Sequence, residues 1–399
     1  MKRPDTAQRP GTARPDRVMP FRRWFLPALM SIATPAFADR LPADGTDVGD
    51  DLVVLTWGGA YEASQRAAYF APFTRATGIE VRTARYDGGI DELRRAREEG
   101  AVPWNIVDLE AADARAACRE GLLEPFDPAV LVEEDGVPVR DDFDAGSIRD
   151  CSVAQLVFST VIGYDVRVFS GEKPRRVQDF FDLERFPGKR GLRCAPVALL
   201  EWALLAYEVP RSQVYDLLST PRGLDLAFRK LDALRGHIVW WRGGDEPGEL
   251  LGSGEVVMSS GYNGRFFEAQ AAAGAPISLI WDGQLVDHAT WAIPRGAKAT
   301  GRAQAFIAFA TRAERMADQA MRISYGPTRD SARRRVGRHV EFGIDMNDHL
   351  PTSGERMRRA VIRDSDWYAR TETLRQRRFA EWLRAPGVGP CPDARERAR

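Results

Sequence analysis

The sequence predicts an α/β protein of two lobes, each a mainly parallel sheet flanked by helices. Three observations predict this fold class. Short apolar strands alternate with helices through residue 121, which favours a parallel sheet covered on both sides. An apolar stretch over residues 153–164 is too long for one ordinary strand, so we expect it to leave the first lobe and enter a second. The same alternation then repeats over residues 165–287.

The first β-loop-α-β unit begins with a continuously apolar run over residues 52–55, which is typical of a strand buried on both faces. Trp57, Gly58 and Gly59 end it, and paired glycines allow a tight turn close to a ligand. A helix follows over residues 60–77, with apolar residues at spacings of three and four. The loop lies at the carboxyl end of a parallel strand, where open α/β sheets bind ligands. Burial of Trp57 in the core is the alternative.

The later elements are expected from the same patterns. Further strands are predicted over residues 79–85, 105–109, 237–241, 256–260 and 277–281, with a return crossing over 290–294. Helices are predicted over residues 91–99, 111–120, 177–181, 199–207, 211–218, 224–235, 264–273, 302–310, 312–322, 353–362 and 373–383. Periodicity alone leaves open whether two crossings join the lobes or two domains simply follow each other.

Length and composition narrow the class of protein. The chain has 399 residues, enough for about two domains. Its composition, 44% apolar and 29% charged, is ordinary for a soluble globular protein. Beyond residue 38 there are 50 Lys and Arg residues against 55 Asp and Glu residues. This mildly acidic body argues against a nucleic-acid partner, because phosphate binding needs a basic face.

The N-terminus indicates export. Arg22 and Arg23 precede a short apolar run over residues 24–33, which leads to an A-x-A end. This pattern predicts a signal peptide over residues 1–38, and the apolar run is too short to span a bilayer. The stretch ahead of Met19 is polar and proline-rich, so we expect translation to start at Met19.

Enzyme and metal signatures are absent from the sequence. There is no G-x-S-x-G, P-loop, G-x-G-x-x-G or H-E-x-x-H motif, and no Tyr-Tyr pair that would indicate iron binding. The histidines are isolated at positions 237, 288, 339 and 349. We therefore expect no catalytic residues, metal site or cofactor.

Aromatic residues at the expected loop ends are the first positive signal for a binding site. Trp57 and Tyr61 follow the first strand, Trp240 and Trp241 end another, and Tyr262 follows a third. Aromatic faces hold alkyl chains and attract ammonium groups. Core packing is the alternative, and for Trp240 and Trp241 we expect one core residue and one cleft residue.

Carboxylates are the second signal. Asp87, Glu110 and Glu201 fall at expected strand ends or helix starts. Glu201 lies among apolar residues in LLEWAL, where a lone charge needs a partner, and a bound ammonium would serve. For Asp87 and Glu110, helix capping is an equally good interpretation.

The chain also resembles a known family. The segments LTWGGAYE, FTRATGIEV, WNIVDLE, STVIGYD, GEVVMSSGYNGR and TWAIPRG together resemble the spermidine/putrescine-binding family of periplasmic solute-binding proteins, over roughly residues 50–385. The resemblance implies a type II periplasmic-binding-protein fold, with two lobes joined by two hinge crossings and solute held between them. It implies a monomer in the periplasm that delivers a small solute to an ABC permease and catalyses no reaction.

The resemblance also implies boundaries. Residues 39–50 form a linker, and residues 51–158 with 292–385 form lobe 1, whose C-terminal helices clasp lobe 2. Lobe 2 spans residues 159–291, and residues 386–399 form a disordered tail. Cysteines at the corresponding places imply a Cys118–Cys151 disulfide, with Cys194 and Cys391 as the remaining pair. Spacing alone allows three connectivities.

A set of ligand-binding residues follows from the resemblance and the patterns above. It comprises Trp57, Gly58, Gly59, Tyr61, Asp87, Glu110, Ser159, Thr160, Glu201, Trp241, Tyr262, Asn263, Arg265 and Trp291.

Two departures from the polyamine-binding pattern bear on the solute. Carboxylates expected at Arg265 and near Ala289 are both absent. Arg265 carries a fork suited to carboxylate or phosphate, so we expect either a polyamine-like solute or one with an amine and an acid. Alternatively, Arg265 points outward or pairs with Glu201 or Glu268.

Two competing functions are considered. The protein could be a receptor that presents its ligand to a membrane chemosensor, or a secreted enzyme.

Overall fold

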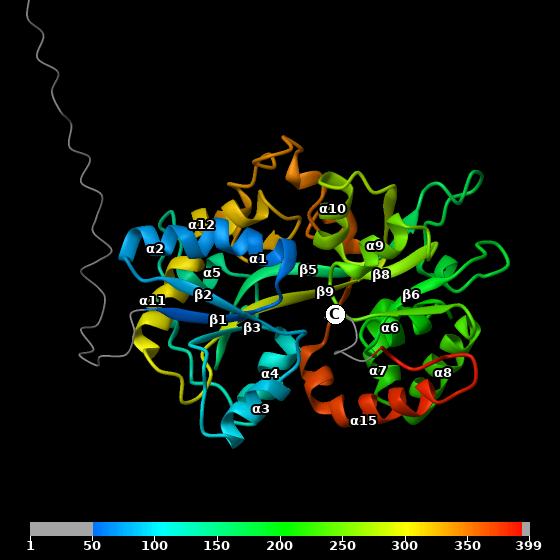
Figure 1. Ribbon diagram of the computed structural model, residues 1–399, viewed down its shortest axis with the longest axis horizontal. Coiled ribbons are helices and arrows are strands. Elements are labelled where there is room, and N and C mark those ends of the chain that lie inside the picture. The colour runs from blue at the N-terminus through cyan, green and yellow to red at the C-terminus, as the bar shows by residue number, and fades with distance from the viewer. Residues whose placement is uncertain (1–50, 393–399) are drawn as a thin grey trace, which may run out of the picture. The chain divides into compact units, whose positions relative to one another are not determined.

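One mixed β-sheet runs through the part of the chain that the computed structural model describes, residues 51–392 (Figure 1). Its main path has the strand order β2-β1-β3-β9-β5-β8-β6-β7, and the short strands β4, β10 and β11 pair off this path. The strands are β1 (Leu52–Thr56), β2 (Val81–Arg85), β3 (Ile106–Glu110), β4 (Ile148–Arg149), β5 (Ser152–Asp165), β6 (Arg190–Arg193), β7 (Ile238–Trp241), β8 (Met258–Tyr262), β9 (Ile277–Ala292), β10 (Gly326–Pro327) and β11 (Val361–Ile362).

Each half of this sheet contains a parallel core. In the half that we call lobe 1, β1 pairs in parallel with both β2 and β3. In the half that we call lobe 2, β6 pairs in parallel with both β7 and β8. The predicted α/β class with mainly parallel sheets is therefore confirmed, including the buried apolar strand β1, in which Leu52 and Val54 are completely buried.

Two long antiparallel strands, β5 and β9, connect the halves. β9 pairs with β3 in lobe 1, and β5 pairs with β8 in lobe 2. The sequence predicted separate strands over 277–281 and 290–294, but β9 is one strand of 16 residues. Its register shifts so that Leu285 faces Thr160 while Ile280 faces Ile162. Gly283, with φ of 72°, lies in this irregular stretch and made the sequence look interrupted.

Helices cover both faces of the sheet in each lobe (Figure 1). They include α1 (Gly59–Gln65), α2 (Ala71–Thr77), α3 (Asp91–Glu98), α4 (Ala111–Arg119), α6 (Leu199–Leu205), α7 (Val214–Leu218), α8 (Pro221–Leu231), α9 (Glu246–Gly252), α10 (Asn263–Ala271), α11 (Thr300–Ala310), α12 (Ala313–Ala320) and α15 (Ser365–Leu383). Shorter helices are α5 (Val139–Asp142), α13 (Asp330–Arg333) and α14 (Gly354–Arg358). The helix predicted over residues 60–77 is present as α1 and α2 joined by a π-helical turn, Arg66–Phe70.

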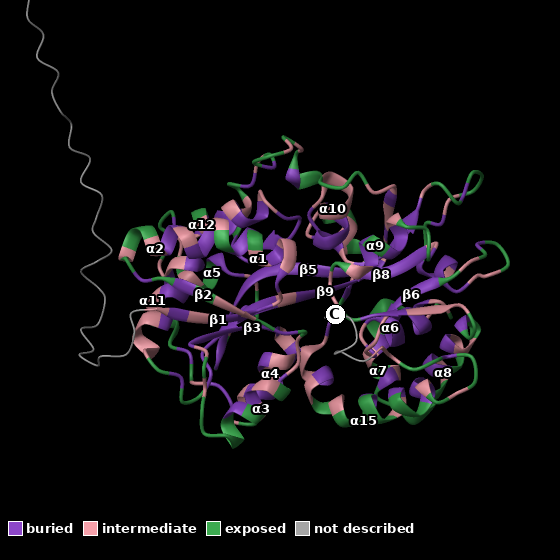
Figure 2. Cartoon of the chain, in the orientation of Figure 1, coloured by how far each residue is buried: buried purple, intermediate pink, exposed green. Residues whose placement is uncertain are grey.

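The two lobes have separate apolar cores, and the strands between the helix layers are largely buried (Figure 2). In lobe 1, Phe70, Phe73 and Phe306 pack around β1 and β3. In lobe 2, Trp202 and Phe180 pack beneath β6. Each lobe thus has its own core, which the architecture of two lobes on one sheet requires.

Helix α15 lies against both lobes, where the sequence predicted C-terminal helices that belong to lobe 1 and clasp lobe 2. Trp367, Tyr368, Phe379 and Trp382 on α15 are buried in the apolar core of lobe 2, although the helix also contacts α4. It runs beside α7 and α8 (Figure 1). The predicted helix began at residue 373, so it included Phe379 and Trp382 but not Trp367 and Tyr368, which lie in the first turn of α15.

Two disulfides tie down irregular segments. The predicted Cys118–Cys151 bridge is present and joins α4 to the start of β5, and Cys194–Cys391 is present as well. Residues 386–392 were predicted to be disordered, but they pack against lobe 2. Val388 is buried, and the indole N–H of Trp240 contacts its carbonyl at 3.2 Å. That prediction is wrong for residues 386–392.

The predicted signal peptide, the linker and residues 393–399 lie outside the described residues. Within residues 51–392, no helix combines the length and the apolar character needed to cross a bilayer. In the same range, no three His, Cys, Asp or Glu side chains are arranged to hold a metal ion.

Candidate functional site

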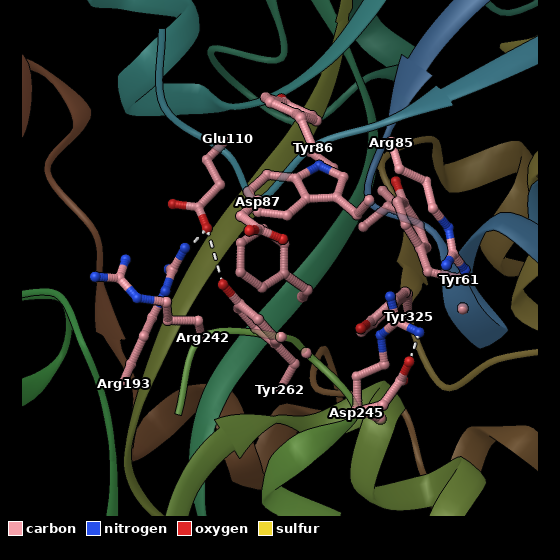
Figure 3. A pocket seen from close by; sticks show the side chains of 18 residues that line it. Tyr61, Arg85, Tyr86, Asp87, Glu110, Arg193, Arg242, Asp245, Tyr262 and Tyr325 are labelled. Atoms are coloured by element: carbon pink, nitrogen blue, oxygen red, sulfur yellow. Dashed lines mark hydrogen bonds and ion pairs between the residues drawn. The ribbon is translucent and has the colours of Figure 1, made fainter. Parts of the chain in front are cut away.

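A cavity of about 210 Å³ lies between the two lobes (Figure 3). Its walls come from the loop after β1, the ends of β2 and β3, the ends of β6, β7 and β8, and the crossing strands. The carboxyl ends of the parallel strands meet here, as expected for a binding site in an α/β sheet. The lining residues are Trp57, Gly59, Tyr61, Arg85, Tyr86, Asp87, Glu110, Leu156, Phe158, Arg193, Arg242, Gly243, Gly244, Asp245, Tyr262, Arg265, Ala289 and Tyr325.

Asp108 on β3 holds three aromatic side chains of lobe 1 in place. Its backbone carbonyl accepts hydrogen bonds from Trp57 Nε1 at 3.1 Å and from the Tyr86 hydroxyl. Its carboxylate accepts from the Tyr61 hydroxyl at 2.7 Å and from Gln65 Nε2 at 2.6 Å. Complete burial raises the pKa of Asp108 to about 7, although the hydrogen bonds from Tyr61 and Gln65 oppose this shift.

The loop after β1 needs its glycines. Gly58 and Gly59 have φ of 71° and 59°, in the left-handed region that glycine adopts without strain. Close by, Gly88 has φ of 89°, and a Cβ there would overlap the indole of Trp57. These glycines let the backbone of lobe 1 approach the cavity closely.

Glu110, the last residue of β3, forms a charged cluster at one end of the cavity (Figure 3). Its carboxylate accepts from the Tyr262 hydroxyl at 3.1 Å, from Arg193 Nη1 at 3.2 Å and from Arg363. Arg363 also pairs with Asp287 at 2.5 Å. Burial alone would raise the pKa of Glu110, but the charges of Arg363 and Arg193 outweigh it and lower the pKa to about 2. Glu110 is therefore ionised and orients Arg193 in the cavity.

Arg265 lines another part of the cavity wall, and its guanidinium group forms an ion pair. Its Nη1 bonds Asp245 Oδ1 at 2.8 Å, and its Nη2 donates to the carbonyl of Gly58 at 2.8 Å. Neither Glu201 nor Glu268, the partners considered from the sequence, is the one found in this ion pair. Arg265 thus joins lobe 2 to the loop of lobe 1 within the described structure.

The structure brings half of the predicted ligand-binding residues to the cavity wall. These are Trp57, Gly59, Tyr61, Asp87, Glu110, Tyr262 and Arg265. The others, Gly58, Ser159, Thr160, Glu201, Trp241, Asn263 and Trp291, do not line it.

Four of the residues outside the lining support it from behind. Gly58 offers its carbonyl to Arg265. The backbone N–H of Ser159 donates to Asn263 Oδ1 at 2.9 Å, and Thr160 lies opposite Tyr262 in the β5–β8 ladder. Ser159, Thr160 and Asn263 are buried, so they fix the hinge strand against α10.

Three predictions are corrected. Glu201 is completely buried in lobe 2, where the hydroxyls of Tyr215 and Tyr368 donate to it at 3.0 and 2.7 Å; these phenols take the place of the expected ammonium. Trp241 is a core residue whose indole N–H contacts Ser260 at 3.2 Å, so neither Trp240 nor Trp241 lies in the cleft.

Trp291 is the third corrected residue. It is fully buried in lobe 1, edge-on to Tyr69 and Phe306. Ala289, two residues earlier on β9, lines the cavity, but Trp291 lies further along the strand and packs in the core of lobe 1. The prediction placed Trp291 on the correct strand but not at the cavity.

Sequence reasoning missed several lining residues. Those with polar or aromatic side chains are Arg85, Tyr86, Phe158, Arg193, Arg242, Asp245 and Tyr325. Arg242 directly follows a predicted strand, so the rule that ligands bind at strand ends could have found it. Arg193 ends β6, which the sequence analysis did not predict as a strand. Tyr325 is far along the chain, and no local pattern marked it.

Comparison with known proteins identifies relatives that match most of the described region. A family model for bacterial extracellular solute-binding proteins matches residues 68–343. A gamma-aminobutyric acid-binding protein of Pseudomonas aeruginosa is 36% identical over 332 residues, covering 83% of this chain and 90% of the relative. These matches extend across both lobes.

Two solved structures are similar in fold as well as in sequence. The periplasmic binding protein MotA of Agrobacterium tumefaciens B6, solved with glucopine, has a TM-score of 0.76 and 27% identity, covering 83% of this chain and 99% of that one. A GABA receptor has a TM-score of 0.71 and 30% identity, covering 83% and 97%.

These relatives are binding proteins and not enzymes, so they confirm the predicted type II fold and the prediction that the chain is not an enzyme. The chain belongs to the bacterial extracellular solute-binding protein family.

Proposed function

We propose that this protein binds a small solute with one amine and one carboxylate, of the 4-aminobutyrate class, in the interlobe cavity. The observation that carries the proposal is a pair of opposite charges on the cavity wall. Arg193, from lobe 2, is held by Glu110 through Nη1. Asp87, from lobe 1, has no hydrogen bond or ion pair within residues 51–392. A carboxylate would bind the remaining guanidinium donors of Arg193, and an ammonium would bind Asp87.

The aromatic walls favour the same solute. Trp57, Tyr86 and Phe158 line the cavity, and they would hold a short methylene chain and attract the ammonium end. Arg193 lies 5.6 Å from the ring centre of Tyr262, which steadies its guanidinium plane. The relatives support the proposal, since two of them bind gamma-aminobutyric acid.

A polyamine fits this wall less well. Four arginines line the cavity, at positions 85, 193, 242 and 265, against the carboxylates of Asp87, Glu110 and Asp245. A dication would place a second ammonium among these guanidinium groups, and like charges in a partly desolvated cavity repel by a few kcal/mol. The polyamine alternative from the sequence is therefore not favoured.

Calorimetry on the purified protein tests the proposal. We expect 4-aminobutyrate to bind, and putrescine and butyrate, which each lack one charge of the solute, to bind at least 100-fold more weakly, about 2.7 kcal/mol. Arg193→Met should weaken 4-aminobutyrate binding by a similar factor, and Asp87→Asn by about tenfold. Arg378→Met, at an ion pair on α15 outside the cavity, is the control. Tighter binding of putrescine than of 4-aminobutyrate would overturn the proposal.

Location and delivery complete the proposed function. We infer that the protein acts in the periplasm as a monomer and hands its solute to an ABC permease in the inner membrane. The extracellular family and the predicted signal peptide support this role. Deletion of the coding sequence should abolish high-affinity uptake of labelled 4-aminobutyrate, and cell fractionation should recover the protein in the periplasm. Normal uptake in the deletion strain would argue against delivery.

A further inference from the structure

Two hollows meet at the Asp245–Arg265 ion pair. The first is the solute cavity. The second is an open groove of about 550 Å³ along α9 and α10, which also reaches Ala60 at the start of α1. Asp245 and Arg265 are the two residues that line both hollows. The pair therefore stands between the cavity and the groove.

Contacts of the Asp245–Arg265 pair hold it in place between the cavity and the groove. Arg265 has a side chain only 5% exposed, and it is neutralised by Asp245 at 2.8 Å. Its other guanidinium nitrogen bonds the carbonyl of Gly58 on the opposite lobe at 2.8 Å. Such a neutralised cation has little charge left for a solute carboxylate, whereas its bulk and its bond across the lobes remain.

The opposite lobe fits closely against this ion pair. Gly59 lines the cavity, while the next residue, Ala60, lines the groove. A Cβ at Gly59 would overlap the Asp245 carboxylate and the Arg265 guanidinium. The absence of a side chain at Gly59 thus allows the loop of lobe 1 to close directly on the ion pair.

We propose that the Asp245–Arg265 pair is the end wall of the solute cavity and limits the length of the solute that the protein accepts. This inference rests on the proposed function. Arg193 binds the carboxylate at the Glu110 end, so a chain extending away from it meets the pair. Beyond the pair, the groove is lined mainly by small residues, among them Gly248, Ala269 and Ala272, with the carboxylate of Glu268 beside them. A longer ω-amino acid would find space and an ammonium partner there once the pair is removed.

A series of ω-amino acids of increasing length tests whether the ion pair limits the length of the solute. Affinities for 4-aminobutyrate, 6-aminohexanoate and 8-aminooctanoate are measured by calorimetry on wild type and on Asp245→Ala/Arg265→Ala. We expect wild type to bind the longest solute at least 30-fold more weakly than the shortest, and the double variant to reduce this ratio to threefold or less. Asp245→Asn keeps the volume of the wall and removes a charge, so its ratio should stay near that of wild type.

The outcomes separate this inference from the proposed function. If the folded double variant binds 4-aminobutyrate but keeps the 30-fold ratio, the wall inference is wrong. If no ω-amino acid binds wild type, the proposed function fails, and a crystal structure of the double variant still decides the wall: a continuous hollow supports it, and a hollow that remains divided overturns it. Should the double variant not fold, Asp245→Ala alone, at a half-exposed side chain, is expected to shift the ratio in the same direction.

Discussion

Two carboxylates on β3, Asp108 and Glu110, are both buried and lie only two residues apart, yet their pKa values move in opposite directions. Asp108 is surrounded by neutral donors, Tyr61 and Gln65, and burial raises its pKa to about 7. For Glu110 burial also acts upward, but Arg363 and Arg193 lower its pKa to about 2. The comparison shows that the charge of the partners, rather than burial, decides which carboxylate is ionised.

The two residues therefore affect stability in opposite pH ranges. The folded-state pKa of Asp108 lies above its unfolded value of 3.8, so its stabilising contribution is complete below 3.8 and is lost as the pH rises through about 7. The pKa of Glu110 lies below its unfolded value of 4.5, so its contribution is complete above 4.5 and is lost as the pH falls towards about 2.

The largest expected effect comes from Glu110→Gln, which removes the charged partner of the buried Arg363 and of Arg193, whose side chain is 15% exposed. We expect the free energy of unfolding at pH 7 to fall by on the order of 3–5 kcal/mol, measured by urea denaturation. Glu120→Gln is the matched control, because Glu120 pairs with Arg94 at 2.6 Å near the surface and its loss should change stability by about 1 kcal/mol at most. Equal losses in the two variants would show that burial of the pair does not matter.

We expect Asp108→Asn to change the free energy of unfolding by less than Glu110→Gln does, and this change should depend on pH in the opposite way. The amide keeps an acceptor for Tyr61 and cannot ionise, so the variant should gain stability relative to wild type between pH 4 and pH 8, by on the order of 2–4 kcal/mol. Measuring the free energy of unfolding at several pH values across this range gives its slope against pH. Asp91→Asn, at an exposed carboxylate, should leave the slope unchanged. A parallel slope for Asp108→Asn and wild type would refute the raised pKa.

Tyr61→Phe should give the smallest change and sharpen the comparison. It removes one donor to the Asp108 carboxylate, which costs about 1 kcal/mol. Because a donor to the ionised form lowers the pKa of a carboxylate, its loss should move the pH range of the Asp108 effect upward. An unchanged midpoint in the stability–pH curve would mean that the Tyr61 hydroxyl does not affect the pKa of Asp108.

The β3–α4 unit shows what the sequence could predict. The apolar run ending at Glu110 placed this residue at a strand end, and the structure puts it on the cavity wall. Asp108, two residues earlier, gave no signal, because its importance depends on donors from other elements. For Glu201, the need for a partner was read correctly, but the donors were not, since Tyr215 and Tyr368 lie 14 and 167 residues away.

The arginines of the cavity wall show the same limit to what the sequence can predict. Arg265 was identified as a cation of the site, but its pairing with Asp245 depends on how α10 packs against the loop after β7. Local patterns fix strands and helices, whereas the partners of a buried charge are set by long-range packing. Secondary structure was therefore predicted better than the charge balance of the site.

The C-terminal segment has a consequence for how the binding site is completed. Cys391 is linked to Cys194, the residue after Arg193, and the carbonyl of Pro392 accepts from Arg242 Nε at 2.7 Å. Two guanidinium groups of the cavity are thus backed by C-terminal residues, which lie 197 positions after Cys194 and 150 positions after Arg242. Contacts of such long range form late because the intervening chain must first be ordered. Maturation of the receptor should therefore end with an oxidation step, and solute capture should lag behind the folding of the lobes.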